Sequence, residues 1–498
     1  MIKLCPAVQG FVFSLFLVFL FNGAICQTLD LRPPQKRFEI LEANILNNKV
    51  LRETAKELES LKAGAIAARD DISYARSLYD LMIIRDKQTI DTMYFQNSAF
   101  MDTLIERRSS SSTLKALMYL LRAQRIAGFE QRYRRFNPGA YRSSNLKVDY
   151  AAFNYKQRAE MVNDDYTSAL KLNDLKGTAS SLSWLPGSGE GFLTTDLKDV
   201  LRYAQIAWLK SQYNEVQEPN MRNKTLLQLP SAAFRNKLDS LSRKADQRNF
   251  GVYFAFNDWL HTVRNNPEKS AFVEALARQQ IFASTMIDSA EKEAYIKYLQ
   301  LNSTSKFQSL KLHAIYQICL IWNVQANDFA ENGKFQFQRK KALDLYERHA
   351  NEFKNYPFYD QALANMAKQI RAAGVAVKLK DKQLPGQKIP IEVDYKNTKA
   401  LHYRIVPITS AEGLAKTNVK LAPVWLNAAP VAQGSFVLPL PDDHQRHNTK
   451  LQLPELPVGW YSLIFGKQEI SNDAANLTAL PFQVTSIAAI NDGQKVYV

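Results

Sequence analysis

The chain has 498 residues, and 46% of them are hydrophobic, which is enough for two to four domains with buried cores. The 64 Lys and Arg residues exceed the 48 Asp and Glu residues by 16. Such a positive balance would suit a nucleic-acid partner. The N-terminal segment predicts export, however, and export excludes most partners of that kind.

Residues 1–26 have the pattern of a secretory signal peptide. Phe11–Phe21 is an uninterrupted apolar run behind Lys3, and small residues stand shortly before Gln27, the expected mature N-terminus. The run is too short to span a bilayer comfortably, so we expect no integral membrane segment after signal removal. The alternative is a lipoprotein acylated at Cys26. Ile25 stands where that signal requires Gly or Ala, so the sequence favours cleavage.

Signal removal would leave Cys319 as the sole cysteine of the mature chain. A single cysteine excludes an internal disulfide, so the exported domains must be stable through packing alone. Because Cys319 lies between Ile318 and Leu320, we expect a buried core thiol and not a nucleophile.

From Phe38 to residue 373 apolar residues recur at helical spacing. The Gly- and Pro-rich stretch Trp184–Gly191 predicts a loop that separates an N-terminal helical region, 27–185, from a second one, 192–373. The expected helices lie near 38–61, 65–85, 88–107, 112–133, 150–173, 196–218, 231–246, 250–264, 268–282, 289–301, 305–327, 336–353 and 358–373.

The end of the second region resembles a tetratricopeptide-style helix pair. Ala342–Arg348 supplies the first helix, Tyr356-Pro357 the turn and Ala362–Ala367 the second helix. No fixed repeat period runs through the chain, so the sequence predicts an irregular helical solenoid.

The pattern changes to period two between Leu379 and Val484, which is typical of half-buried strands. About seven short strands predict an antiparallel β-sandwich over 374–486, with 487–498 as the start of a further domain. The predicted fold class is therefore α+β multidomain. The expected strands are Val375–Leu379, Ile389–Tyr395, Leu401–Ile405, Phe436–Leu440, Lys450–Leu453, Tyr461–Phe465 and Phe482–Val484.

The strongest strand pattern lies within Leu453–Phe465. Strand side chains alternate between faces, so one face of this strand carries three residues that we expect in the structural core, namely Tyr461, Leu463 and Phe465.

The opposite face of the same strand carries Trp460 and Ile464, which are unusually apolar for a solvent-facing surface. We expect these two residues to form an interface. The cover would be either the helices near 336–373 or the domain expected after the sandwich. The sequence favours the further domain, which would leave Trp460 exposed in this chain.

No motif for catalysis appears, so the sequence predicts neither an enzyme nor a cofactor site. The run 186–191 has the glycines of a phosphate loop without its Lys, and it is interpreted as a connector. The segment Asp442-Asp443-His444-Gln445-Arg446-His447 could ligate a metal through carboxylates and imidazoles. It lies between predicted strands, where polar turn residues are common, and the sequence favours a turn without metal.

The densest basic stretch is Arg122–Phe136, in which aromatic residues alternate with arginines. In a cytosolic protein this would suggest RNA binding. In an exported protein a solvated helix face is the expected structure, with anionic envelope surfaces as a second interpretation, and no nucleic-acid partner is predicted.

Two sequence patterns in the sandwich are typical of one known family. A Tyr-x-Asn strand leads into a strand with Tyr and Arg, and a Leu-Pro-x-Gly-x-Tyr segment enters a late strand. The matching residues are Tyr395, Asn397, Tyr403 and Arg404 for the first pattern and Leu456, Pro457, Gly459 and Tyr461 for the second. With the preceding helices, the chain resembles the N-terminal part of a bacterial alpha-2-macroglobulin-like protein, ending in its first macroglobulin-like domain.

This resemblance implies a non-catalytic exported scaffold in the periplasm or outside the cell, at the bacterial cell envelope. The implied role is that of the N-terminal segment of an endopeptidase inhibitor, with proteases or envelope proteins as partners. Trapping members of the family carry a Cys-Gly-Glu-Gln thioester and a bait segment, neither of which occurs here, because Cys319 lies in Ile-Cys-Leu-Ile. The alternative function is a module that binds an envelope protein or polysaccharide.

Overall fold

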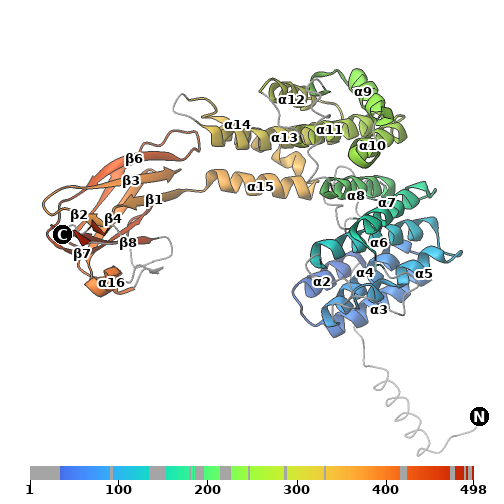
Figure 1. Cartoon of the computed structure of the whole chain (residues 1–498), viewed down its shortest axis with the longest axis horizontal. Helices are drawn as coiled ribbons and strands as arrows, with labels where there is room; N and C mark the ends of the chain where they lie inside the picture. The colour runs from blue at the N-terminus through green and yellow to red at the C-terminus, as the bar shows by residue number, and fades with distance from the viewer. Residues whose placement is uncertain are drawn as a thin grey trace, which may run out of the picture. The chain divides into compact units, whose positions relative to one another are not determined.

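The computed structural model describes residues 34–89, 93–133, 150, 153–178, 181–182, 184–185, 196–212, 226–244, 247–284, 289–329, 333–414, 423–470, 477–486, 490–491 and 496–497. The predicted signal peptide and the loop at 186–191 lie outside these residues. The fold is α+β multidomain, with helices up to Arg371 and antiparallel sheets from Gly374 (Figure 1). Internal contacts define two compact units, Met1–Glu218 with Lys244–Trp259, and Pro219–Arg243 with Leu260–Val498.

The first unit is helical, and its helix starts follow from capping residues in the sequence. Asp70 accepts hydrogen bonds from the backbone N–H groups of Ile72 and Ser73 at the start of α4. Asn154 and Gln157 form a capping box at the start of α7. The helices are α2 (Pro34–Leu46), α3 (Leu51–Ala68), α4 (Asp71–Gln88), α5 (Phe100–Glu106), α6 (Ser112–Tyr133), α7 (Tyr155–Lys171), α8 (Leu197–Gln212) and most of α10 (Gln247–Thr262).

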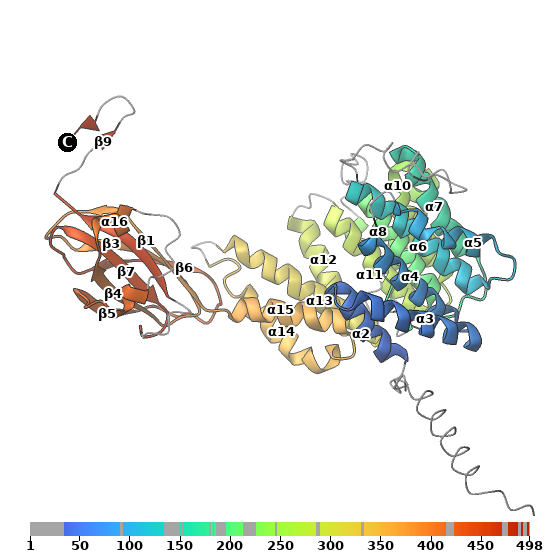
Figure 2. The ribbon, with the colours of Figure 1, turned by 90° about the horizontal axis from the view of Figure 1, so that it is seen from below.

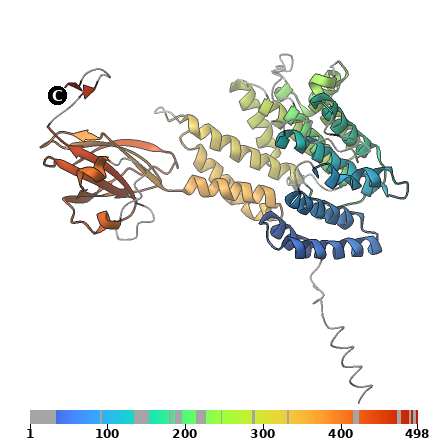
Figure 3. The same ribbon diagram turned by 60° about the horizontal axis from the view of Figure 1, so that its bottom comes forward.

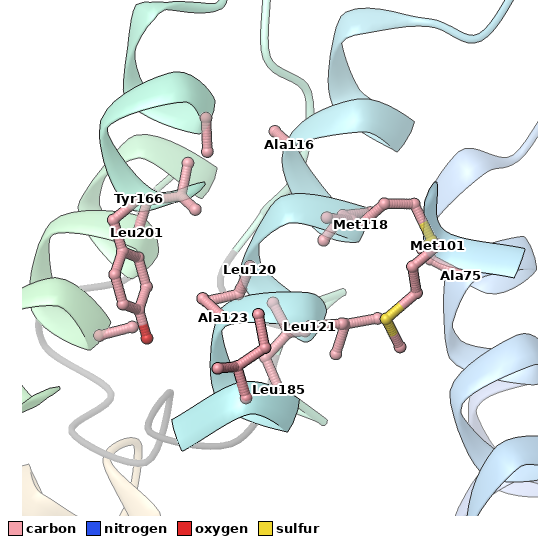
Figure 4. Close-up of a cluster of buried hydrophobic side chains, with 14 of the residues drawn as sticks. Ala75, Met101, Ala116, Met118, Leu120, Leu121, Ala123, Tyr166, Leu185 and Leu201 are labelled. Atoms are coloured by element: carbon pink, nitrogen blue, oxygen red, sulfur yellow. The ribbon is translucent and has the colours of Figure 1, made fainter. Parts of the chain in front are cut away.

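The core of this unit forms around α6. Figure 4 shows Met118 of α6 beside Met101 of α5, with Tyr166 of α7 and Leu201 of α8 on the other side of α6. All four side chains are buried. Because α6 is enclosed on several sides, most of its residues between Thr113 and Ile126 are buried or half-buried.

The helices of the second unit centre on α13, which contacts α11, α12, α14 and α15 (Figure 1). Cys319 lies in α13 and is fully buried, as its apolar neighbours predict. Arg278 of α11 is also buried, and it donates hydrogen bonds to the carbonyls of Leu227 (3.2 Å) and Leu229 (2.7 Å). The helices are α9 (Ser231–Lys244), α11 (Pro267–Ser284), α12 (Ser289–Asn302), α13 (Gln308–Gln325), α14 (Gln338–Phe353) and α15 (Pro357–Arg371).

Helix α15 leads into the first strand of the sandwich after only two residues (Figure 3). The strands are β1 (Gly374–Leu379), β2 (Lys382–Gln383), β3 (Ile389–Lys396), β4 (Ala400–Pro407), β5 (Ala432–Val437), β6 (His447–Leu453), β7 (Gly459–Gly466) and β8 (Thr478–Val484). One sheet has the order β1-β3-β6, and the other has the order β2-β8-β7-β4-β5. All neighbours are antiparallel except β2 and β8.

The sandwich core receives alternate side chains from both sheets, as the period-two pattern predicts. Along β3, Ile389, Ile391, Val393 and Tyr395 are buried while the residues between them are less so. The residues expected in the core from β7 lie there too, and they are Tyr461, Leu463 and Phe465, with exposures of 5%, 0% and 3%.

Some predicted boundaries were wrong. A single helix was expected near 38–61, but α2 ends at Leu46 and α3 begins at Leu51, because Asn48 and Val50 have positive φ angles of 53° and 41°. The strand expected at Phe436–Leu440 ends at Val437 instead. After it, Leu438 is buried whereas Leu440 is 44% exposed, so a simple alternation does not extend that far.

The outer face of the five-stranded sheet has a cover of its own, which corrects the expected interface at Trp460 and Ile464. Ile464 is fully buried, and with Val406 it packs against Trp425 and Leu426 of α17 (Pro423–Asn427). Trp460 is half-buried and not exposed. The cover of Ile464 comes from the connection between β4 and β5 and not from the helices near 336–373.

The residues after the sandwich contain a short antiparallel pair, β9 (Ile490–Asn491) with β10 (Val496–Tyr497). Within the part of the chain that is described, no helix combines the length and the apolar content that crossing a bilayer requires.

Candidate functional site

The polar segment Asp442–His447 lies between β5 and β6, and it contacts the start of α14 and the turn between β3 and β4. We call this contact region the helix–sandwich junction. It comprises residues 335–340, the end of α15 with the two residues that follow it (369–373), 396–397, 442–447 and Lys467. It lies within the second unit. The sequence predicted a polar turn at 442–447 but gave no signal for its partners.

Asp443 is the centre of this junction and is 1% exposed. Its carboxylate accepts hydrogen bonds from the Gln336 side chain (3.0 Å), the Gln445 backbone N–H (2.9 Å) and His447 Nε2 (3.0 Å). Burial by itself raises the pKa of Asp443, but these hydrogen bonds outweigh it and hold the pKa below its usual value. Asp443 is therefore a charged group that links α14 to the sandwich.

Two cations of α14 complete the contact. Arg339 donates to the Gln445 side-chain oxygen (2.6 Å) and to the His444 carbonyl (3.4 Å). Lys340 forms an ion pair with Asp442 at the exposed edge of the junction. Gln445, which is 2% exposed, donates in return to the carbonyl of Gln336 (3.0 Å). Each partner thus satisfies polar groups that the other buries.

The end of α15 is capped by side chains of the sandwich. The last carbonyls of a helix lack partners inside the helix and need them elsewhere. Two carbonyls of the last turn accept hydrogen bonds from sandwich side chains, Gln369 from Lys396 (3.0 Å) and Ile370 from Asn397 (2.7 Å). Just after the helix, the carbonyl of Ala372 accepts from Asn397 (3.2 Å) and that of Ala373 from Lys467 (3.5 Å). The helix end and the sheet are therefore complementary at the level of single atoms.

Asn397 joins the two halves of the junction. Its amide nitrogen donates to α15, so its Oδ1 atom is an acceptor, and His444 Nδ1 donates to it over 3.0 Å. This network assigns the proton of a neutral His444 to Nδ1. Burial is the main reason why the pKa of His444 lies below its usual value.

Backbone strain is concentrated here. Phe335, Asn397 and His444 all have positive φ angles, of 63°, 50° and 56°. A non-glycine residue in this conformation costs on the order of 1–3 kcal/mol and persists only where surrounding contacts determine it. The hydrogen bonds among these residues and their neighbours provide such contacts, so the junction has one specific geometry.

The histidines and carboxylates of residues 442–447 take part in the hydrogen bonds and the ion pair of the junction. Asp443 and His447 bond to each other, while Asp442 and His444 bond to Lys340 and Asn397. Among the described residues, no group of three or more His, Cys, Asp or Glu side chains converges to hold a metal ion. The arrangement holds two elements together, the start of α14 and the sandwich.

The Leu-Pro-x-Gly-x-Tyr pattern also has a structural reason. The hydroxyl of Tyr461 donates to the carbonyl of Pro457 (3.1 Å), four residues upstream. Gly459 makes room for this contact, because a Cβ atom there would lie 2.9 Å from the Tyr461 hydroxyl. The pattern therefore builds a tyrosine corner at the start of β7, a feature that sandwich domains share.

Arg404, from the first pattern, holds the cover of the outer sheet face. It donates to the carbonyls of Leu426 (2.9 Å) and Ala428 (3.0 Å) at the end of α17. On the inner face of the same strand, Tyr403 stacks on Phe436 with ring centroids 5.2 Å apart. Sequence reasoning found these residues as a pattern but missed their contacts, because the partners lie 20 to 40 residues away.

The basic stretch that begins at Arg122 was expected to form a solvated helix face, and this was wrong for its first part. Arg122 bonds to Asp165 (3.0 Å) and Asp102 (2.7 Å), and Arg125 forms an ion pair with Asp86 in a buried setting. The carboxylates come from three other helices, so no local signal could have paired them. Residues 134–136 of this stretch lie outside the described residues.

Comparisons with known proteins give no further assignment. No protein-family model matches the chain, and no curated protein matches its sequence.

Proposed function

We propose that this chain is a non-catalytic exported scaffold, corresponding to the N-terminal segment of an alpha-2-macroglobulin-like endopeptidase inhibitor. In this role the last helices carry a macroglobulin-like sandwich and determine where later parts of such an inhibitor begin. The observation that carries the proposal is the capping of α15 by Asn397, the Asn of the Tyr-x-Asn pattern.

The chemistry of the one thiol in the described residues supports a role without covalent capture. Cys319 is fully buried, and burial raises its pKa to about 12. Because the thiolate is the reactive form, such a cysteine is inert at neutral pH. His313, the buried histidine of the same helix, bonds to Tyr359 and not to a nucleophile (Nδ1 to hydroxyl, 3.4 Å).

The first test uses the purified chain with a serine, a cysteine and a metalloprotease. We expect no SDS-stable adduct with any protease and no hydrolysis of peptide, ester or glycoside substrates. A covalent adduct that methylamine abolishes would contradict the proposal, as would a hydrolase activity that follows the protein through purification.

The second test reads the gene beyond the codon for Val498 and compares the chain with the complete gene product. The proposal expects the complete product to slow protease digestion of a large protein substrate, and Asn397→Gly in that product to weaken this effect. A stop codon directly after Val498, together with binding of envelope polysaccharide by the chain, would contradict it and favour a stand-alone binding module.

A further inference from the structure

The strand β5 lies at one end of the five-stranded sheet, at the border of the sandwich in Figure 2. It pairs with β4 on one side, and no other described strand pairs with its second side. The backbone groups of such an edge are a template for another strand. Val431 and Val437, at the two ends of β5, are 50% and 88% exposed.

The register defines which backbone groups face the open side. The N–H of Leu438 donates to the carbonyl of Lys399 (2.8 Å), next to the pair Val437↔Ala400. Hydrogen-bonded and non-bonded pairs alternate along an antiparallel ladder. The N–H and C=O groups of Gln433, Ser435 and Val437 therefore point away from β4, toward the open edge.

This edge differs in charge from the other edges of the sandwich. Natural edge strands are commonly protected by Lys or other charged residues, and β1, β2 and β6 carry Lys378, Lys382 and Lys450. The 21 residues from Leu421 to Pro441 contain no charged residue at all, in a chain with a formal charge of +16. Among the described edges of the sandwich, the edge of β5 is thus the one where two copies of this basic protein could meet without opposing like charges.

We propose that β5 pairs with β5 of a second copy of this chain, antiparallel and about a two-fold axis at Ser435. The proposal goes beyond the scaffold function. In this register Ser435 lies opposite Ser435 of the second copy, and Gln433 lies opposite Val437 of the second copy. The outward backbone groups of the two strands then hydrogen-bond to each other. Pro430 and Pro439 flank the strand and, lacking N–H groups, limit the ladder to the residues between them.

A second copy fits this edge better than a charged partner peptide. The stretch offers no charged side chain that would recognise an acidic or a basic ligand, so charge complementarity favours an uncharged strand. The two-fold arrangement is isologous, with the same surface used by both partners, which closes the assembly at a dimer. Both five-stranded sheets would then form one continuous sheet.

Cysteine cross-linking of the full chain tests this register. Cys5→Ser and Cys26→Ser remove the other thiols of the unprocessed chain, and Cys319 is buried. Residues in a hydrogen-bonded antiparallel pair have Cα atoms about 5.5 Å apart, within disulfide range. We expect Ser435→Cys to form a disulfide dimer under mild oxidation, at least tenfold faster than Gln452→Cys on β6, where the side chain is also exposed. Equal rates would overturn the proposal.

Two further variants test the same contact by association. Sedimentation velocity of the wild-type chain should show a concentration-dependent dimer. Ser435→Pro removes an N–H that points to the open edge and leaves the bonds to β4 in place, so it should abolish the dimer, whereas Ser435→Thr should retain it. A wild-type chain that stays monomeric up to 100 μM, or a dimer that persists in Ser435→Pro, would overturn the proposal. If Ser435→Pro does not fold, Val437→Lys replaces it. This change places a positive charge on the β5 edge of both copies, so it should also abolish the dimer.

Discussion

At the scale of single residues, burial changes the acid–base chemistry of His313 in α13. Its side chain is 1% exposed, it packs edge-to-face against Phe272, and its Nε2 atom has no hydrogen-bond partner among the residues that the structure describes. Burial lowers the pKa of His313 to about 3, so the imidazole is neutral in the folded protein. In the unfolded chain the pKa is about 6.5.

The first prediction is therefore a pH dependence of stability. Below pH 6.5 the unfolded chain binds a proton that the folded chain does not, so this contribution is complete above pH 6.5 and declines as the pH falls toward 3. We expect the free energy of unfolding to fall by up to about 1.4 kcal/mol per pH unit in this window. Urea titrations of wild type and His313→Leu between pH 7 and 4.5 measure the difference.

The control for this prediction is Gln452→Leu, at an exposed position of β6. This change removes no titratable group, so it should leave the slope with pH unchanged. If His313→Leu has the same slope as wild type, the imidazole is protonated in the folded state and the interpretation of its burial is wrong.

A second prediction concerns Phe465 in the sandwich core. The side chain is 3% exposed and packs with the alternate residues of both sheets. Phe465→Ala should destabilise the protein by ~3–5 kcal/mol through lost transfer free energy and the cavity left behind. Gln452→Ala, at an exposed position of β6, should change the free energy of unfolding by less than about 0.5 kcal/mol. Unchanged thermal melting of Phe465→Ala would contradict the core assignment.

At the scale of elements, the connection between β4 and β5 decides how the outer sheet face is covered. Trp425 and Leu426 are 3% and 5% exposed because they pack on Val406 and Ile464. The cover is attached through the two hydrogen bonds of Arg404. Thr409 and Glu412 add a capping box at α16 (Ser410–Leu414).

The third prediction tests this attachment. Arg404→Met keeps much of the side-chain volume but removes both bonds to the end of α17, which leaves two carbonyls without a partner. We expect the protein to lose about 1–3 kcal/mol of stability. Amide hydrogen exchange should become at least tenfold faster in residues 423–428 but not in β3. Equal exchange in wild type and Arg404→Met would show that apolar packing alone holds the cover.

At the scale of the whole molecule, the helix–sandwich junction joins the two kinds of structure in the second unit. The carbonyls at the end of α15 depend on sandwich side chains, and Asp443 depends on Gln336 at the start of α14. Each side thus supplies hydrogen-bond partners to polar groups of the other. We therefore expect the last helices and the sandwich to unfold together.

The fourth prediction tests this coupling with Asn397→Gly. Glycine accepts the positive φ angle of this position without strain, so the change removes the side-chain bonds and retains the backbone conformation. We expect trypsin to cleave after Arg371 several-fold faster than in wild type, as followed by mass spectrometry. Asn48→Gly is the matched control, because Asn48 also has a positive φ angle, 53°, and lies in the first unit. Identical cleavage rates after Arg371 in the two variants would contradict the coupling.

Much of this fold could be predicted from local sequence patterns. The period-two pattern placed most strands of the sandwich, and the core residues of β7 follow from it directly, because successive strand residues point to opposite faces. Helical spacing placed the helices in the same way. The caps at Asp70 and Asn154 are local signals that define the starts of α4 and α7.

The sequence by itself determined the order of helical region and sandwich and which face of each strand is apolar. Only the tertiary structure decided what covers those faces. The sequence around Ile464 is apolar whatever packs on it. The packing of α17 there depends on Trp425 and Leu426, which lie some 40 residues away in the sequence. The same holds for Asp443, whose partner Gln336 is 107 residues distant. Apolar periodicity depends on neighbours within a few residues, whereas the pairing of buried polar groups depends on which distant segments the fold brings together.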